Sequence, residues 1–145
     1  MANKSKPETI FLKGHQVQKE GQASAALSPG HLVERGGSKS FQKQSTAKGV
    51  CSPMFAVEND LIGKEITDAY AANDNVVVAY ALPGAEINAR VAASATAIVA
   101  NDALEAAGDG TVRKFTDGVI IGYALEAINN SSNSSSEVFI KMEIK

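Results

Sequence analysis

The sequence has little of what thiol, metal and stacking chemistry requires. It contains no tryptophan, one cysteine (Cys51) and two histidines (His15 and His31), and aromatic residues make up 6% of its 145 positions. A single cysteine cannot form a disulfide within the chain, so the fold does not depend on an oxidising compartment. The core has to be built from Val, Ile, Leu and Ala, and a chain of this length suits one domain.

Long apolar runs are missing too. The N-terminal stretch MANKSKPETIFLKG carries charges but no apolar h-region, so it is unlike a secretory signal. No run approaches the roughly 18 apolar residues that a membrane-spanning helix needs. From these absences we expect a soluble protein that is made inside a cell and has no membrane partner.

Histidine, cysteine and glycine are not arranged for catalysis. Neither His15 nor His31 has a partner at metal-ligand spacing. The segment ERGGSKS lacks the first glycine and the strand-to-helix context of a phosphate-binding loop. Cys51 paired with a histidine would be a nucleophile, but a lone cysteine beside a proline-bounded strand is more often a small buried hydrophobe. We therefore expect no enzyme, no cofactor and no metal site.

Charge is distributed unevenly along the chain. Residues 1–50 carry a net charge of +5 and residues 51–145 a net charge of −7. A basic segment before an acidic body indicates an electrostatic partner, which is nucleic acid, an acidic protein surface or the acidic body of a neighbouring copy. The basic part has too few aromatic side chains to stack on single-stranded bases, so we expect no nucleic-acid partner.

The segment VANDALEAAGDGTVRKF gathers Asp102, Glu105 and Asp109 around a Gly-Asp-Gly turn. Their spacing differs from the Asp-x-Asp-x-Asp-Gly pattern that wraps calcium. Glycine next to aspartate is typical of tight turns with positive φ. We expect a hairpin in which Asp102 stands at a strand entry and Glu105 lies on the solvent face. In the similar segment GHLVERGGSKSFQKQ (30–44), the corresponding position holds Arg35 and glycines, which are not acidic. A negative charge that is absent from one of two similar segments favours a structural role over a metal site.

Strand signals dominate the chain, and they predict a mostly β protein with many short strands. In AEINARVA, the alternation places Ile87, Ala89 and Val91 on one face. One helix is predicted over Leu61–Ala72, with Asn59 or Asp60 as its N-cap. The expected strands are HLVER, SFQKQ, MFAVE, NVVVAYAL, AEINARVA, DALEA, TVRKF, VIIGYALEAI and EVFIKMEI.

Two parts of the sequence resemble each other. GHLVERGGSKSFQKQ (30–44) is similar to NDALEAAGDGTVRKF (101–115), and the later MFAVE is similar to GYALE. Either two pseudo-equivalent β-units close on each other in a small barrel, or the likeness is that of unrelated hairpins. Ahead of this region, residues 1–26 are polar and have one apolar cluster, Ile10-Phe11-Leu12. We expect these residues to form an extended arm or a simple tail, and residues 27–145 to form the body.

From Asn75 to Lys145 the sequence resembles the small head decoration (cement) proteins of tailed bacteriophages. The shared features are a strand ending in a Pro-Gly turn, an Ala-rich segment, a DALE…GDGTV.K hairpin, a GYALE strand, a Ser-rich loop and a final V.IK.E strand. The resemblance implies a β-barrel or tulip-like body that binds the outside of an expanded capsid and stabilises it by bridging subunits. The implied partner is the major capsid protein.

The same resemblance implies a homotrimer that is made in the host cytoplasm and located on the virion exterior. Members of the family use a terminal arm to reach capsid subunits. The alternatives are a head–tail connector or fibre component, or a non-catalytic ligand-binding barrel. The candidate capsid-contact residues are therefore those of the arm: Lys4, Lys6, Ile10, Phe11, Leu12 and Lys13.

Overall fold

The computed structural model describes residues 9–145, and strands account for nearly all of its regular structure. The one helical element in this range is the 3-10 turn η1 (Asp60–Ile62). The predicted helix over 61–72 is therefore wrong, and Gly63 ends η1 in the left-handed region at φ 75°. The strands are β1 (Phe11–Lys13), β2 (Gln16–Ala23), β3 (Val33–Gly37), β4 (Ser40–Lys43), β5 (Met54–Val57), β6 (Asn75–Ala81), β7 (Glu86–Val91), β8 (Ala103–Ala106), β9 (Val112–Lys114), β10 (Gly122–Ala124) and β11 (Val138–Ile144).

The C-terminal half forms a closed barrel of five strands. Its order is β7-β11-β10-β8-β9, and β9 returns to β7 through a parallel pairing of Val112 with Val91. All other neighbours in this ring are antiparallel. β1 is an additional strand that lies on the free part of β7, where Phe11 is opposite Ile87. The prediction of a small β-barrel is thus confirmed.

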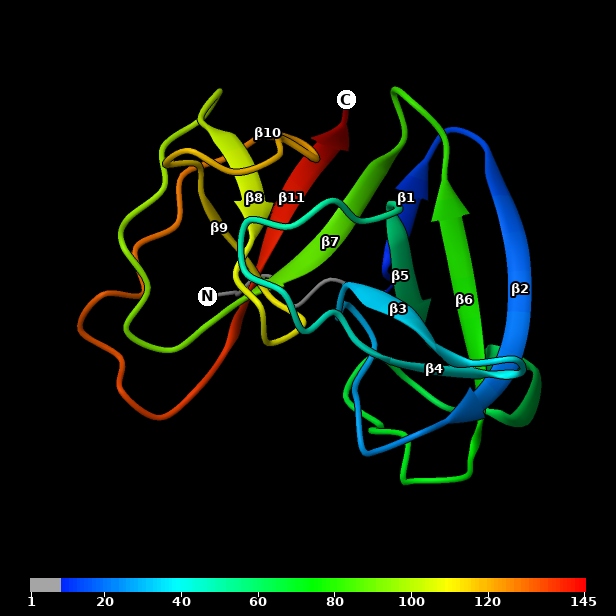
Figure 1. The fold of residues 1–145 in the computed structure, drawn as a ribbon. Coiled ribbons are helices and arrows are strands. Elements are labelled where there is room, and N and C mark those ends of the chain that lie inside the picture. Colours follow the sequence, from blue (N-terminus) through cyan, green and yellow to red (C-terminus); the bar gives the residue numbers. More distant parts are fainter. Residues whose placement is uncertain (1–8) are drawn as a thin grey trace.

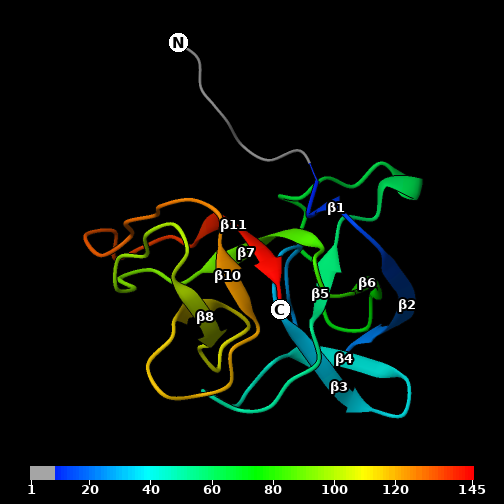
Figure 2. The ribbon, with the colours of Figure 1, turned by 90° about the horizontal axis from the view of Figure 1, so that it is seen from above.

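The N-terminal half repeats this ring. Its order is β3-β4-β2-β6-β5, and an antiparallel bridge between Leu32 and Phe55 brings β5 back beside β3. As in the other barrel, one pairing is parallel, β2 with β4, and the others are antiparallel. Figure 1 shows the two units side by side, and Figure 2 shows the same arrangement from above.

The two barrels agree in register as well as in strand order. Phe41 opposite Ala23 corresponds to Val112 opposite Val91, with offsets of 71 and 68 residues. Leu32 opposite Phe55 corresponds in the same way to Ala103 opposite Tyr123. The repeat is therefore a duplicated five-stranded unit. It begins at β2 rather than at Gly30, and each copy closes its own barrel instead of closing on the other.

Alternating side chains fill the two interiors. In β7 the predicted face of Ile87, Ala89 and Val91 is buried, and β11 buries Ile140, Met142 and Ile144. One apolar cluster, called the junction cluster below, fills the C-terminal barrel and the junction between the barrels. A smaller cluster around Phe41 fills the N-terminal barrel.

The described part of the predicted arm belongs to the body. β2 pairs with β6 along its length, from Gln16 opposite Ala81 to Gln22 opposite Asn75. β1 pairs with β7, so the chain links both barrels before it enters the first. The predicted boundary between arm and body at residue 26 is therefore wrong, since residues 9–26 belong to the body. Backbone pairing supplies the order that their polar side chains do not. Residues 1–8 lie outside the described residues.

Candidate functional site

The predicted capsid-contact residues occupy very different environments. Ile10 is completely buried in the junction cluster, so its side chain cannot be a surface anchor in this fold. Phe11 and Leu12 are partly buried and Lys13 is exposed. Lys4 and Lys6 lie outside the described residues, and their contact role stays a prediction.

Glu58 fixes the start of β1. Its carboxylate accepts hydrogen bonds from the Thr9 hydroxyl and, at 3.1 Å, from the Ile10 backbone N–H. Asn88 N–H in turn donates to the Ile10 carbonyl at 2.8 Å. Beside these residues lies a groove of about 270 Å³ that Phe11 and Leu61 help to line. Leu61 is 85% exposed, so this groove has an apolar rim on the surface.

The three acidic residues around the Gly-Asp-Gly turn do not converge on one point. Asp102 accepts from Val99 N–H at 2.9 Å and pairs with the Lys114 ammonium, which confirms it at the entry to β8. Asp109 accepts from Thr111 N–H within its own turn. Glu105, expected on the solvent face, is completely buried, and this expectation is wrong.

Glu105 is buried because neighbouring donors satisfy its carboxylate. Gly118 N–H donates at 2.8 Å, Arg113 Nε at 2.9 Å and the Thr116 hydroxyl at 3.0 Å. Burial by itself would raise the pKa of Glu105, but these hydrogen bonds outweigh it and the pKa lies below its ordinary value. A buried charge with this many donors is compatible with a structural role.

The duplication places Glu34 at the position of Glu105. Gln42 Nε2 donates to Glu34 at 2.9 Å and the Ser45 hydroxyl at 2.7 Å, from the positions of Arg113 and Thr116. The hydrogen bonds from Ser45 and Gln42 lower the pKa of Glu34 against the smaller effect of burial. Both copies therefore have a glutamate at this position, and the sequence alignment that placed Arg35 there is wrong. The recurrence of this glutamate beside both hairpins indicates that it holds the loop after each hairpin.

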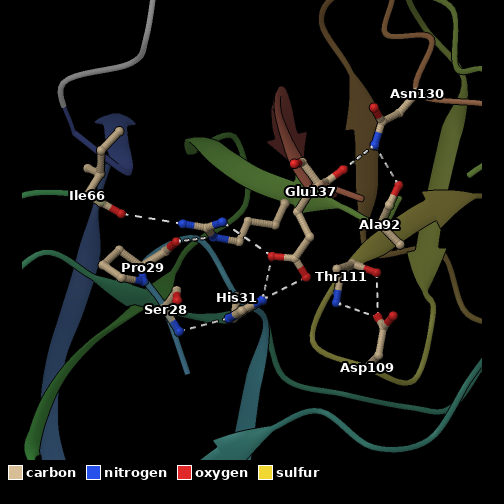
Figure 3. A network of polar contacts seen from close by, with 11 residues as sticks. Ser28, Pro29, His31, Ile66, Ala92, Asp109, Thr111, Asn130 and Glu137 are labelled. Atoms are coloured by element: carbon tan, nitrogen blue, oxygen red, sulfur yellow. Dashed lines mark hydrogen bonds and ion pairs between the residues drawn. The ribbon is translucent and has the colours of Figure 1, made fainter. Parts of the chain in front are cut away.

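A second polar cluster joins the barrels, and no motif in the sequence indicates it (Figure 3). Arg90 on β7 donates through Nε to the Pro29 carbonyl at 2.6 Å and pairs with Glu137 at 3.3 Å. Its guanidinium carbon lies 4.6 Å from the centre of the Phe139 ring. Buried His31 contacts Glu137 through Nε2 at 3.0 Å. Arg90 and His31 are 47 and 106 residues away from Glu137 in sequence, so only the fold brings them together.

The hydrogen bonds of His31 define its tautomer. Ser28 N–H donates to Nδ1 at 2.9 Å, so Nδ1 carries no proton and Nε2–H donates to Glu137. Burial raises the pKa of Glu137, but the His31 hydrogen bond and the charge of Arg90 outweigh burial, and the pKa is lowered. Nδ1 of His31 thus holds its own loop at Ser28, and Nε2 links that loop to Glu137.

The other candidates for chemistry lie apart. His15 is exposed, and Cys51 is a partly buried free thiol packed against the junction cluster. Within residues 9–145 no three His, Cys, Asp or Glu side chains gather closely enough to hold a metal ion. No helix in the same range has the length and apolar character to cross a membrane.

The fold and its polar clusters define a tandem β-barrel protein whose central charged groups hold its own loops and barrels together. The same fold occurs in the crystal structure of the head fiber gp8.5 N base in bacteriophage phi29. The TM-score is 0.59 at 15% sequence identity, over 90% of this chain and 95% of that chain. At this identity the likeness concerns the fold. No family model matches the sequence, and the curated proteins contain no match.

Proposed function

We propose that this protein is a structural component of a tailed-phage head. In this role it binds the outer surface of the capsid and catalyses no reaction. The single observation that carries the proposal is the shared fold with the base of a head fiber, over nearly the full length of both chains. The resemblance of residues 75–145 to head decoration proteins supports the same location by a separate route.

The finer role is to stabilise the shell by bridging subunits of the major capsid protein, as a homotrimer. A protein that binds only the assembled shell stabilises it by mass action. Simultaneous contact with several subunits multiplies modest affinities through the high effective concentration of the second site. The tandem barrel suits bridging, because it presents two similar units on one chain.

A second candidate is a fiber component, which is favoured specifically because the similar structure is the base of a head fiber. In that role the barrels attach a projection to the head instead of reinforcing the shell. The two candidates differ in copy number and in the consequence of removal. A reinforcing protein covers the shell and protects it, whereas a fiber base occupies fewer sites and leaves shell stability unchanged.

The test compares purified particles with and without this protein by electron cryomicroscopy, together with their resistance to heat. Reinforcement predicts density at every equivalent site between capsid subunits and earlier heat-induced genome release without the protein. A fiber base predicts density beneath a projection and equal heat resistance. Absence of the protein from purified virions by mass spectrometry would refute both. Native mass spectrometry then tests the trimer.

A further inference from the structure

The duplication reveals a strand position that is filled in one barrel and empty in the other. In the C-terminal barrel, β1 covers β7 at Glu86 and Ile87. The offset of 68 residues maps these positions onto Gln18 and Lys19 of β2. Within residues 9–145, pairing on this side of β2 is limited to Gln22 and Ala23, which pair with β4. The edge from Gln16 to Gly21 therefore lacks, within that range, the strand that its counterpart has.

The backbone of this edge is oriented for strand addition. Gln22 N–H donates toward β4, to the Lys39 carbonyl at 3.0 Å. Alternate residues of a strand direct their N–H and C=O groups to the same side, so those of Gln18 and Glu20 point to the open side, away from β6. In the other barrel, the equivalent of Glu20 is Asn88, whose N–H donates to Ile10 at the start of β1. The open edge thus repeats the donors that bind β1.

Side chains at the covered edge of β7 are buried, whereas a side chain at the open edge of β2 is exposed. Ala85 and Ile87, beside β1, are at most 1% exposed. Val17, the counterpart of Ala85, is 49% exposed. An added strand carrying an apolar residue would cover Val17 as β1 covers its equivalents. An exposed strand edge with an apolar side chain is a common template for pairing with another chain.

The charges around the edge select the kind of strand. Lys19 lies on the edge itself, and Arg35 and Lys39 line a groove of about 440 Å³ that continues from it beside Glu20. None of these three cations forms an ion pair within the described part of the chain. Three cations against one carboxylate complement an acidic segment, and opposite charges on neighbouring strands add to pairing.

We propose that the outer edge of β2, from Gln16 to Gly21, binds an extended acidic segment of a partner protein as an added antiparallel strand. The antiparallel direction follows from β1, which runs antiparallel to β7 in the equivalent position. Backbone hydrogen bonds supply affinity, and alternate side chains of the segment contact Val17 and Lys19. This site is defined by the duplication and does not depend on the proposed function.

The test uses the full chain and a fluorescent peptide, Glu-Glu-Thr-Ile-Phe-Leu-Glu-Glu, which keeps residues 9–12 between glutamates. Anisotropy at low salt should show binding at least tenfold tighter than for the same peptide with lysines in place of the glutamates. Amide exchange by NMR should slow at Gln18 and Glu20 when the peptide is bound. Methylating alternate backbone nitrogens of the peptide should abolish binding for one set and spare it for the other.

Two protein variants complete the test. Gln18→Pro removes an N–H on the open side and should weaken binding at least tenfold. The exposed pair Arg35→Gln and Lys39→Gln keeps the backbone pairing of the strands and should erase the preference for glutamates. Absence of peptide binding, or binding that both variants leave unchanged, would overturn the proposal. Protection of Gln18 and Glu20 that grows with protein concentration without peptide would also overturn it, because a second copy would then occupy the edge.

Discussion

Replacing Ile10 by alanine tests whether residue 10 belongs to the core, as in the observed fold, or to an extended N-terminal arm. Ile10 is completely buried between the barrels, and its backbone bonds to Glu58 and Asn88 do not involve the side chain. The substitution therefore removes packing alone. Large-to-small changes of this kind in a core cost about 2–5 kcal/mol of unfolding free energy. For a chain of this size, that corresponds to a melting temperature lower by about 5–15 °C.

The assay is urea and thermal unfolding followed by far-UV circular dichroism, because the protein has no tryptophan to report on unfolding. The matched control is Val17→Ala. It also removes methyl groups from the same segment, but Val17 is half exposed, and its loss should stay within about 0.5 kcal/mol. Equal stability of wild type and Ile10→Ala would refute the placement of residue 10 in the core and restore the arm.

Three further predictions concern charged and reactive groups. Since the pKa of Glu137 is lowered from 4.5, its ionised form stabilises the fold above that value. The stability difference between wild type and Glu137→Gln should therefore be full at neutral pH and shrink as the pH falls below 4.5, and a difference independent of pH would contradict this. Glu105→Gln should cost about 1–3 kcal/mol in urea unfolding, and the half-buried equivalent Glu34→Gln less than about 1 kcal/mol; equal costs would show that burial does not set the difference. Burial and the charge of Glu34 raise the pKa of Cys51, so iodoacetamide should modify it more slowly at pH 8 than in urea-unfolded protein, and equal rates would exclude a protected thiol.

The sequence predicts those features that depend on neighbouring residues. Alternation in AEINARVA identifies the buried face of β7, and the Gly-Asp-Gly turn joins β8 and β9 as expected. The likeness between residues 30–44 and 101–115 identifies two related hairpins. Pattern alone cannot show that each hairpin closes a separate barrel, because closure depends on pairings such as Val91 with Val112 that join distant segments.

The wrong expectations have a common physical origin. Glu105 and β2 look solvated by composition, yet the hydrogen-bonding groups of both are satisfied by partners that composition does not reveal. Arg113 and the loop around Gly118 satisfy the carboxylate of Glu105, and β6 satisfies the backbone of β2. The junction of Arg90, His31 and Glu137 has no sequence signal for the same reason, since no local spacing marks residues that meet only after both barrels have formed.

Comparison of the two barrels also distinguishes features that the barrel needs in order to fold from features that are available to bind a partner. The glutamate beside each hairpin, with donors from the second strand and the loop after it, is present in both copies, as expected of a feature that the unit needs in order to fold. Among residues 9–145, a strand covers the outer edge in one copy only. Because both units close in the same way, that strand is no requirement of the barrel itself. Barrel closure does not account for the exposed Val17 or for the three cations that form no ion pair within this range. The proposed binding of a partner strand at this edge rests on that difference between the two copies.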